Sequence, residues 1–180
     1  HQQYPLRPGL AKEELRSRKF SNYSAKLFNA LLAFWQESSQ IRVEGSNVAL
    51  YDFKPTLSPE EEQLLQKIEK SYVDNKFQPP MWSELSAKLE VSQGQGEELL
   101  RYLVGQGRLL KIDEDLYFHA KAVEEAKGLI TNHVKEQGSV QLAEVRDLLG
   151  SSRKYVLPLL EYFDQIKFTK RIQDKRILFR

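Results

Sequence analysis

The last thirty residues of the chain, 151–180, concentrate positive charge in a form that can hold a polyanion. They contain eight lysines and arginines against three aspartates and glutamates, whereas all 180 residues together carry a formal net charge of only +2. Residues 1–150 are therefore net negative, and the average hides the basic end. A charge asymmetry of this kind indicates a nucleic-acid partner, because backbone phosphates attract clustered lysine and arginine.

Two clusters within this segment have the residue types that contact phosphate. One opens an expected helix, where serine hydroxyls, free backbone N–H groups and two cations would meet the ligand. The other is a charged turn between two expected strands. The predicted nucleic-acid-binding residues are Ser151, Ser152, Arg153, Lys154 and Tyr155 in the first cluster and Lys170, Arg171, Lys175 and Arg176 in the second. Arg153 or Tyr155 is the candidate for contact with a base, although Tyr155 could instead pack beneath the helix.

No arrangement of residues predicts catalysis. His1, His119 and His133 are scattered, and cysteine is absent, so neither a nucleophilic triad nor a structural zinc site is expected. The acidic run 113–115 lacks the glycine and the spacing of a calcium loop. The phosphate-binding motif G-x-x-x-x-G-K-[ST] does not occur. We expect no catalytic residue, no metal and no cofactor in this chain.

The composition indicates a soluble protein of the cytoplasm. Hydrophobic residues make up 41% of the chain and charged residues 29%, and no apolar run is long enough to cross a membrane. The absence of cysteine fits a reducing compartment. The chain begins at His1 without a methionine, and we interpret it as a fragment of a longer protein. A monomer is expected.

The segments that carry these clusters belong to an internal repeat. Moving sixty positions along the chain brings Leu99-Leu100 onto Leu159-Leu160, and moving back by 68 brings the same pair onto Leu31-Leu32. Near the end the third copy gains one residue, as a longer turn would require. Each copy has a short helix, a longer amphipathic helix and two short strands. The expected ranges are 13–18, 25–37, 41–43 and 48–50; 84–89, 97–105, 109–112 and 116–118; and 144–149, 153–164, 168–172 and 177–179.

The second and third copies also have a leading helix, expected from Ser58-Pro59 onward and over residues 120–136. This order of elements is typical of the winged-helix form of the helix-turn-helix. The leading helix of the first copy is expected before His1. The predicted fold is α+β and mainly helical: an elongated tandem array of three winged-helix domains. Their boundaries are 1–54 for a domain lacking its first helix, 55–119 for a spacer and 120–180 for the nucleic-acid-binding domain.

The three copies differ at the start of the longer helix. A basic cluster alone is usually solvated surface, but the second copy has Glu97 and Glu98 there and an acidic turn, and the first copy has a single charge, Lys26. Glutamates in a first helical turn stabilise the helix and repel phosphate. Only the third copy combines a basic helix start with a basic turn, which favours binding over mere solvation.

The residues 151–164, followed by 168–171 and 174–177, resemble the C-terminal end of the bacterial selenocysteine-specific translation elongation factor of the SelB type. Residues 4–16 and 115–119 are also similar to that family. The resemblance implies a GTPase with four appended winged-helix domains, of which this chain would hold an incomplete second, the third and the fourth. It implies that the last domain binds the SECIS hairpin of selenoprotein mRNA through residues 151–155, Arg171, Lys175 and Arg176.

Through the full-length factor the resemblance further implies the ribosome and selenocysteinyl-tRNA as partners, and GTP and magnesium in an N-terminal half that this chain does not contain. Two alternatives remain open. A tandem winged-helix DNA-binding regulator would normally need a symmetric dimer or a second basic recognition helix. A protein-interaction scaffold would bind no nucleic acid at all.

Overall fold

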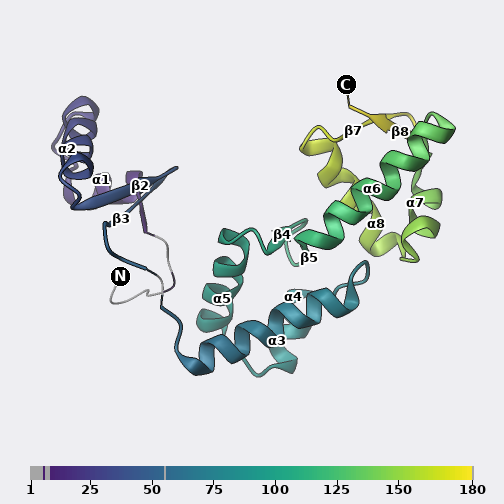
Figure 1. Ribbon diagram of the computed structural model, residues 1–180, viewed down its shortest axis with the longest axis horizontal. Helices are drawn as coiled ribbons and strands as arrows, with labels where there is room; N and C mark the ends of the chain where they lie inside the picture. Colours follow the sequence, from purple (N-terminus) through teal and green to yellow (C-terminus); the bar gives the residue numbers. More distant parts are fainter. Residues whose placement is uncertain (1–5, 7–8, 55, 180) are drawn as a thin grey trace. The chain divides into compact units, whose positions relative to one another are not determined.

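The computed structural model describes residue 6, residues 9–54 and residues 56–179 (Figure 1). The chain divides into two compact units, His1–Glu62 and Gln63–Arg180. The expected boundary at 119/120 therefore falls inside the second unit, and the division into three domains stays a prediction. Over the described residues the protein is mainly helical with short antiparallel hairpins, as expected of winged-helix domains, and none of these helices has the length and apolar character to cross a bilayer.

The first unit is a small sheet with two helices. Its elements are β1 (Leu10–Ala11), α1 (Lys12–Lys19), α2 (Ala25–Glu37), β2 (Ile41–Glu44) and β3 (Asn47–Leu50). The strands are antiparallel in the order β1-β3-β2. Phe28 and Leu32 of α2 pack on Val48 of β3, so one helix face and one sheet face close the core. The opposite side of α2 keeps large apolar side chains in solvent, among them Phe34 at 61% exposure.

The second unit holds the other two copies of the repeat, apart from residues 59–62, which begin the first helix of the second copy and belong to the first unit. Its elements are α3 (Pro59–Asn75), α4 (Trp82–Lys88), α5 (Gln93–Gly105), β4 (Leu109–Lys111), β5 (Tyr117–His119), α6 (Ala120–Gln137), β6 (Val140–Gln141), α7 (Leu142–Leu149), α8 (Arg153–Gln165), β7 (Thr169–Ile172) and β8 (Lys175–Leu178). We call the segment from α3 to β5 the second repeat and the segment from α6 to β8 the third repeat. The expected start of α5 at Glu97 was wrong by four residues.

The repeat is visible in backbone detail. Helices α2, α5 and α8 are each 13 residues long, and each follows a serine N-cap: Ser24, Ser92 and Ser152. After each helix the backbone passes through one residue with a positive φ, in the left-handed region: Ser39, Gly107 and Lys167. The next residue donates its N–H to a carbonyl five positions earlier, at 2.9 Å in all three copies. Up to the first strand of each hairpin, the sequence shifts therefore identified equivalent backbone positions. The expectation that the third copy then gains one residue was wrong: Leu109 pairs with His119 and Thr169 with Leu178, so the hairpin turn of the third copy is one residue shorter.

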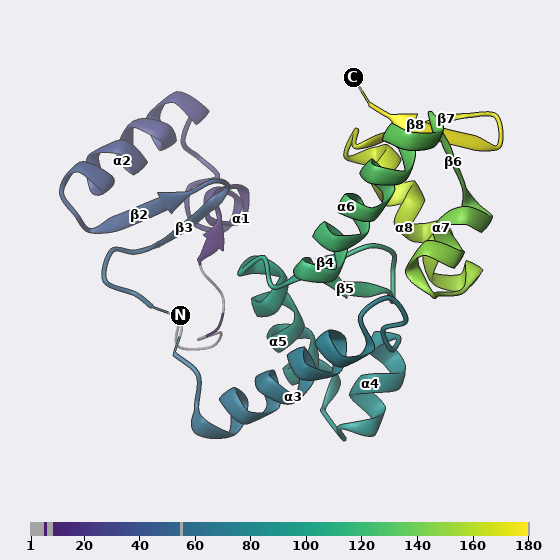
Figure 2. The same cartoon turned by 45° about the vertical axis from the view of Figure 1, so that its right-hand side comes forward.

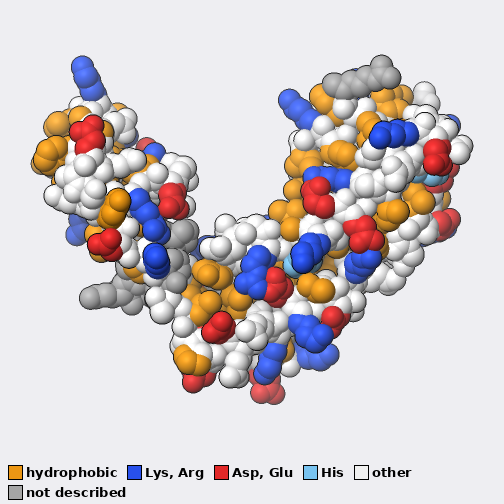
Figure 3. Space-filling view, viewed as in Figure 1, with side chains coloured by type: hydrophobic (Ala, Val, Ile, Leu, Met, Phe, Trp, Pro, Cys, Tyr) orange, Lys and Arg blue, Asp and Glu red, His pale blue; other side chains and the backbone are white. Residues whose placement is uncertain are grey.

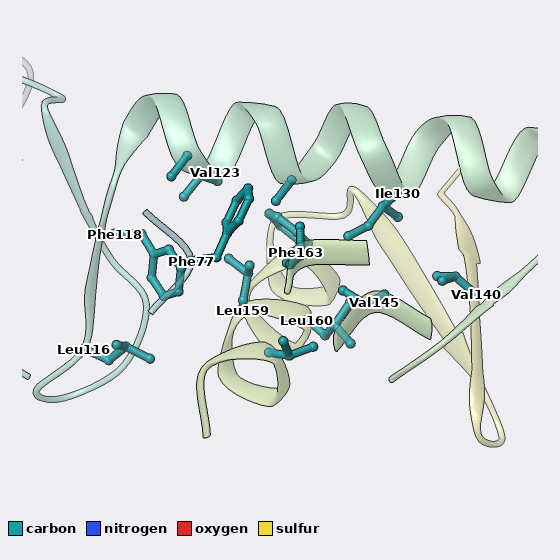
Figure 4. Close-up of a cluster of buried hydrophobic side chains, with 14 of the residues drawn as sticks. Phe77, Leu116, Phe118, Val123, Ile130, Val140, Val145, Leu159, Leu160 and Phe163 are labelled. Carbon is teal, nitrogen blue, oxygen red and sulfur yellow. The ribbon is translucent and has the colours of Figure 1, made fainter. Parts of the chain in front are cut away.

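The buried cluster of the third repeat extends into the adjoining edge of the second repeat. Strand β5 ends at His119 and α6 begins at Ala120, so no linker separates them. Phe77 and Phe118 of the second repeat lie in the same buried cluster as Val123 of α6 and Phe163 of α8 (Figure 4). Figures 1 and 2 show α6 leaving the β4–β5 hairpin and lying along α8. Because each large buried side chain stabilises by about 1.5–3 kcal/mol, this shared core holds the two repeats together.

The hairpins of the two repeats differ in extent. In the third repeat the strands form a three-stranded antiparallel sheet in the order β6-β8-β7, with Ile172 opposite Lys175. Only Gln173 and Asp174 connect β7 to β8, and Gln173 has φ 56°. The hairpin of the second repeat consists of β4 and β5 alone among the described strands. The third repeat therefore has the longer wing, which carries the basic residues.

Candidate nucleic-acid interface

The N-terminal end of α8 is arranged to receive an anion. Ser152 is extended at φ −117° and ψ 164°, and its carbonyl accepts hydrogen bonds from the N–H groups of Tyr155 and Val156 at 3.1 and 3.0 Å. Its hydroxyl makes no capping bond, and Ser152 is exposed. The first turn of α8 contains no acidic residue. The positive end of the helix dipole is therefore open to a negatively charged ligand.

The two cations of this turn extend into solvent beside a fixed ring. Arg153 and Lys154 are both exposed, and Lys154 Nζ lies 5.5 Å from the centre of the Tyr155 ring. Tyr155 itself is half-buried and packs against the core of the second unit. Of the two alternatives for Tyr155, the structure thus favours packing beneath the helix, and Arg153 is left as the candidate for contact with a base.

Ser151 is engaged inside the protein. Its hydroxyl donates to the carbonyl oxygen of Phe77 at 2.6 Å, and the residue is half-buried. We predicted a phosphate ligand here, but the hydroxyl proton is already committed to a backbone carbonyl of the second repeat. The spacing of Ser151-Ser152 in the sequence contains no signal that separates the two serines, because the acceptor lies 74 residues away.

The wing presents three of its four predicted cations. Lys170, Arg171 and Lys175 are exposed on the β7–β8 hairpin. Arg171 Nε donates to the carbonyl of Gln173 at 2.9 Å, which turns the guanidinium toward the tip of the hairpin. Its remaining N–H groups are suited to a phosphate or to a base edge. Helix α8 leads directly into β7, so the same repeat positions both basic clusters.

The expectation that Arg176 lies on the exposed face was wrong. Its side chain is buried at 4% exposure, and its Nε donates to Asp164 Oδ2 at 2.9 Å. Thr169 donates to the other oxygen of the same carboxylate at 2.6 Å. The sequence contains no signal for this, because strand alternation with the apolar Ile177 would place Arg176 on the outer face, and its partner Asp164 lies on another element. Arg176 belongs to an internal polar cluster, which we call the Asp164 cluster: Asp164, Thr169 and Arg176.

The second repeat uses the corresponding positions for packing and capping. Gly96, in the first turn of α5, lies so close to Trp82 that an added Cβ would meet the indole at 2.9 Å. The acidic turn 113–115 is not simply solvated. The Asp115 carboxylate accepts bonds from the Ser83 N–H at 2.9 Å and from the Ser83 hydroxyl at 2.5 Å, and so caps α4. Within the described residues no group of three His, Cys, Asp or Glu could hold a metal ion.

The distribution of charge over the visible surface is mixed. Over the second unit, basic and acidic side chains alternate on the face shown in Figure 3. The second unit has ion pairs between neighbouring residues of one helix, such as Lys70–Asp74 at 2.9 Å and Lys127–Glu124 at 2.7 Å. The N-terminal end of α8 differs, because two neighbouring cations stand there beside a helix start without an acidic residue.

Family models match both ends of the chain. Two models described as "Elongation factor SelB, winged helix" match residues 1–50 and 132–178. The second of these is the model for a third winged helix, whereas the resemblance in the sequence counted the last domain as the fourth. The matched segments include α1 to β3 in the first unit and much of the third repeat in the second.

Two proteins similar to this chain are both described as selenocysteine-specific elongation factors. The chain is 31% identical over 179 residues to the selenocysteine-specific elongation factor of Escherichia coli (strain K12), covering 99% of this chain and 28% of that protein. It is 28% identical over 176 residues to that of Desulfomicrobium baculatum, again covering 28% of the relative. The chain therefore spans little more than a quarter of these relatives.

Two solved structures are similar as well. The mRNA-binding domain of elongation factor SelB from E. coli, solved in complex with SECIS RNA, matches with a TM-score of 0.60 and 30% identity over 69% of this chain and 100% of that one. A bacterial selenocysteine-specific elongation factor EF-Sec matches with a TM-score of 0.54 and 18% identity over 96% of this chain and 26% of that one, which supports the fold alone. With both ends matched by SelB models and a SelB domain matched over its whole length, this chain belongs to the SelB family and comprises winged-helix domains of it.

Proposed function

We propose that this chain is the RNA-binding C-terminal part of a selenocysteine-specific elongation factor. Its last winged helix would bind the SECIS hairpin of an mRNA and so direct selenocysteine incorporation at a UGA codon. The observation that carries the proposal is the match to the whole of an mRNA-binding domain solved with SECIS RNA. The exposed cations at the start of α8 and on the wing supply the charge that such a ligand needs.

The chemistry of RNA decides how these residues would be used. The major groove of A-form RNA is too deep and narrow for a helix to read, so sequence-specific recognition targets loops and unstacked bases. We assign phosphate contacts to Ser152, Lys154 and the wing residues Lys170, Arg171 and Lys175. Arg153 is assigned to an unstacked base or its phosphate. The half-buried Tyr155 supports the turn from beneath.

The other partners belong to the longer protein. By the same proposal, the missing part would bind GTP and magnesium and would deliver selenocysteinyl-tRNA to the ribosome, while this chain catalyses nothing. We place the factor in the cytoplasm, where translation occurs, and expect it to act as a monomer.

A titration separates this function from the two alternatives. The chain is titrated with a hairpin RNA and with duplex DNA of equal length, each at two salt concentrations. We expect tighter binding of the hairpin and an affinity for it that falls as salt rises, because counterions are released from the phosphates. Equal or tighter binding of the duplex would favour a DNA-binding regulator. Absence of binding to either would favour a protein-interaction scaffold.

A further inference from the structure

The turn between α3 and α4 reaches the start of α8, far along the chain. Phe77 accepts the hydrogen bond of the Ser151 hydroxyl at 2.6 Å, and Gln78 Nε2 donates to the carbonyl of Gly150 at 2.9 Å. Lys76 Nζ lies 2.7 Å from Glu125 Oε1 on α6. Three consecutive residues of the second repeat thus contact the third repeat, two of them at the residues that immediately precede the N-cap Ser152.

The Phe77 side chain anchors this turn. It is 9% exposed and lies in the cluster that includes Val123 of α6 and Leu159 of α8 (Figure 4). A phenylalanine inserted among these residues cannot withdraw without leaving a cavity, which would cost several kcal/mol. The backbone of residues 76–78 is therefore fixed relative to α6 and α8, and the two hydrogen bonds of the turn transmit that fixed position to residues 150 and 151.

Besides the two hydrogen bonds from the turn, the residues before α8 are held by local backbone bonds at the C-terminal end of α7. Gly150 has φ 55°, in the left-handed region, and the Ser151 N–H bonds the Arg146 carbonyl of α7 at 3.0 Å. The Ser152 hydroxyl adds no cap to the helix. The residue of the second repeat that corresponds to Ser151 is Val91. Val91 has no hydroxyl, and its side chain lies close to Gly96. The polar link to a preceding repeat thus occurs where the third repeat has its basic helix start.

We propose that the turn 76–78 of the second repeat is a positioning element for the RNA-binding end of α8. Phe77, Gln78 and Ser151 act as positioning residues, which hold the first turn of α8 so that Arg153, Lys154 and the free N–H groups face the ligand together. This inference rests on the proposed function and deepens it. The RNA-binding unit is then residues 63–180, and a fragment limited to about residues 121–180 loses affinity because it lacks the turn.

The test is a double-mutant cycle in the full chain. Gln78→Ala and Arg153→Gln are made singly and together, and Gln66→Ala, an exposed glutamine on α3, serves as the matched control. We expect Gln78→Ala to weaken hairpin RNA binding about two- to tenfold, the range of one lost hydrogen bond. In the Gln78→Ala background Arg153→Gln should cost less than in the unaltered chain, because Arg153 is already misplaced. Gln66→Ala should change nothing.

A second measurement needs no RNA. Amide hydrogen exchange at Tyr155 and Val156, whose N–H groups bond the Ser152 carbonyl, should accelerate in Gln78→Ala and in Ser151→Ala but not in Gln66→Ala, and Ser151→Thr should restore slow exchange because it keeps a hydroxyl. Faster exchange with unchanged RNA affinity, or losses that simply add, would overturn the positioning role. If the unaltered chain does not bind the hairpin RNA, the proposed function fails, and that result is distinct from a failure of the cycle.

Discussion

The second and third repeats have the same backbone frame and different surface chemistry. Helices α5 and α8 have equal length, equivalent serine N-caps and equivalent exits through Gly107 and Lys167. Their first turns differ, since α5 packs Gly96 on Trp82 and α8 exposes Arg153 and Lys154. The spacing of apolar residues and a few residues with positive φ therefore determine this fold, whereas the exposed side chains determine what each repeat binds.

The second and third repeats also differ in their interior. At the repeat positions of Asp164 and Thr169 the second repeat has Val104 and Leu109, and Leu109 is fully buried. Arg176 pairs with Arg171 on β7, and the corresponding partner of Lys111 in the second repeat is Tyr117, which is also buried. The third repeat thus has a charged cluster where its neighbour has two aliphatic side chains and a tyrosine. A buried ion pair of this kind is weak evidence for net stability, but breaking it by removing one partner is costly.

The largest effect is therefore expected at Arg176. Arg176→Ala leaves the Asp164 carboxylate, 24% exposed, without its cation. We expect the free energy of unfolding to fall by about 3 kcal/mol, the lower end for buried pairs because Asp164 retains some solvent. Lys175→Ala, next along the strand and exposed, should change stability by less than about 0.5 kcal/mol. Urea unfolding measures both. An Arg176→Ala protein that is fully stable and yet binds RNA poorly would return Arg176 to the binding surface.

The next effect concerns the first turn of α8. The double variant Arg153→Gln, Lys154→Gln removes both charges while keeping long polar side chains. If both cations contact phosphate, the slope of log affinity against log salt should fall by roughly 1.4–1.8, at about 0.7–0.9 per contact, and affinity should drop by about tenfold or more. Binding titrations over a salt series measure both quantities.

The matched control for the α8 variant lies in the second repeat. Lys111→Gln removes an exposed charge from the β4–β5 hairpin and should leave affinity and salt slope intact. If Lys111→Gln weakens binding as much as the α8 variant, the RNA surface spans both repeats, and the contrast between them disappears.

A smaller effect is expected at Asp115, in the acidic turn of the second repeat. Asp115→Ala removes the carboxylate that bonds Ser83 at the start of α4. Loss of an N-terminal capping side chain costs about 1 kcal/mol. Thermal or urea unfolding should show that loss with RNA affinity unchanged, and Glu114→Ala, an exposed neighbour, should show none. A change in RNA affinity with Asp115→Ala would mean that the acidic hairpin influences binding.

The positions of the main helices were predictable because the same weak sequence pattern occurs three times. Three copies of Leu-Leu at fixed shifts located α2, α5 and α8, and Ser58-Pro59 marked the start of α3, where Ser58 and Glu61 exchange hydrogen bonds. The start of α5 was misplaced, because Gly94 and Gly96 are poor helix formers and tertiary packing on Trp82 overrides that preference.

The interior contacts were not predictable in the same way. Arg176 looked like one more cation of a basic wing, since its partner Asp164 lies on another element and pairing depends on the fold. The role of Ser151 depends on Phe77, 74 residues earlier, and Phe77 itself comes from a turn beside Pro79 and Pro80 that has no periodicity. Long-range contacts of single residues leave no local pattern in one sequence.

The smallest effect is expected where the two repeats join. His119 ends β5 and caps α6, with its Nδ1 accepting the Lys121 N–H at 3.3 Å. Burial, followed by the nearby charges of Lys121 and Arg108, lowers the pKa of His119 below its ordinary value of 6.5. The Glu69 carboxylate lies 3.4 Å from Nε2 of His119. Because Glu69 is already paired with Arg108, it stabilises a proton on His119 only weakly.

The sign of the pH dependence follows from that direction. Below pH 6.5 the unfolded chain takes up a proton at His119 before the folded chain does, so the contribution of His119 to stability is present above pH 6.5 and is lost as the pH falls through the folded pKa. Urea unfolding between about pH 7.5 and pH 5 should show this decline, and His119→Gln should reduce it. A stability that rises on acidification and loses that rise in His119→Gln would mean that Glu69 attracts the proton after all. In that case the junction between the repeats would be held by a charged pair, as the interior of the third repeat is, and not by a neutral cap.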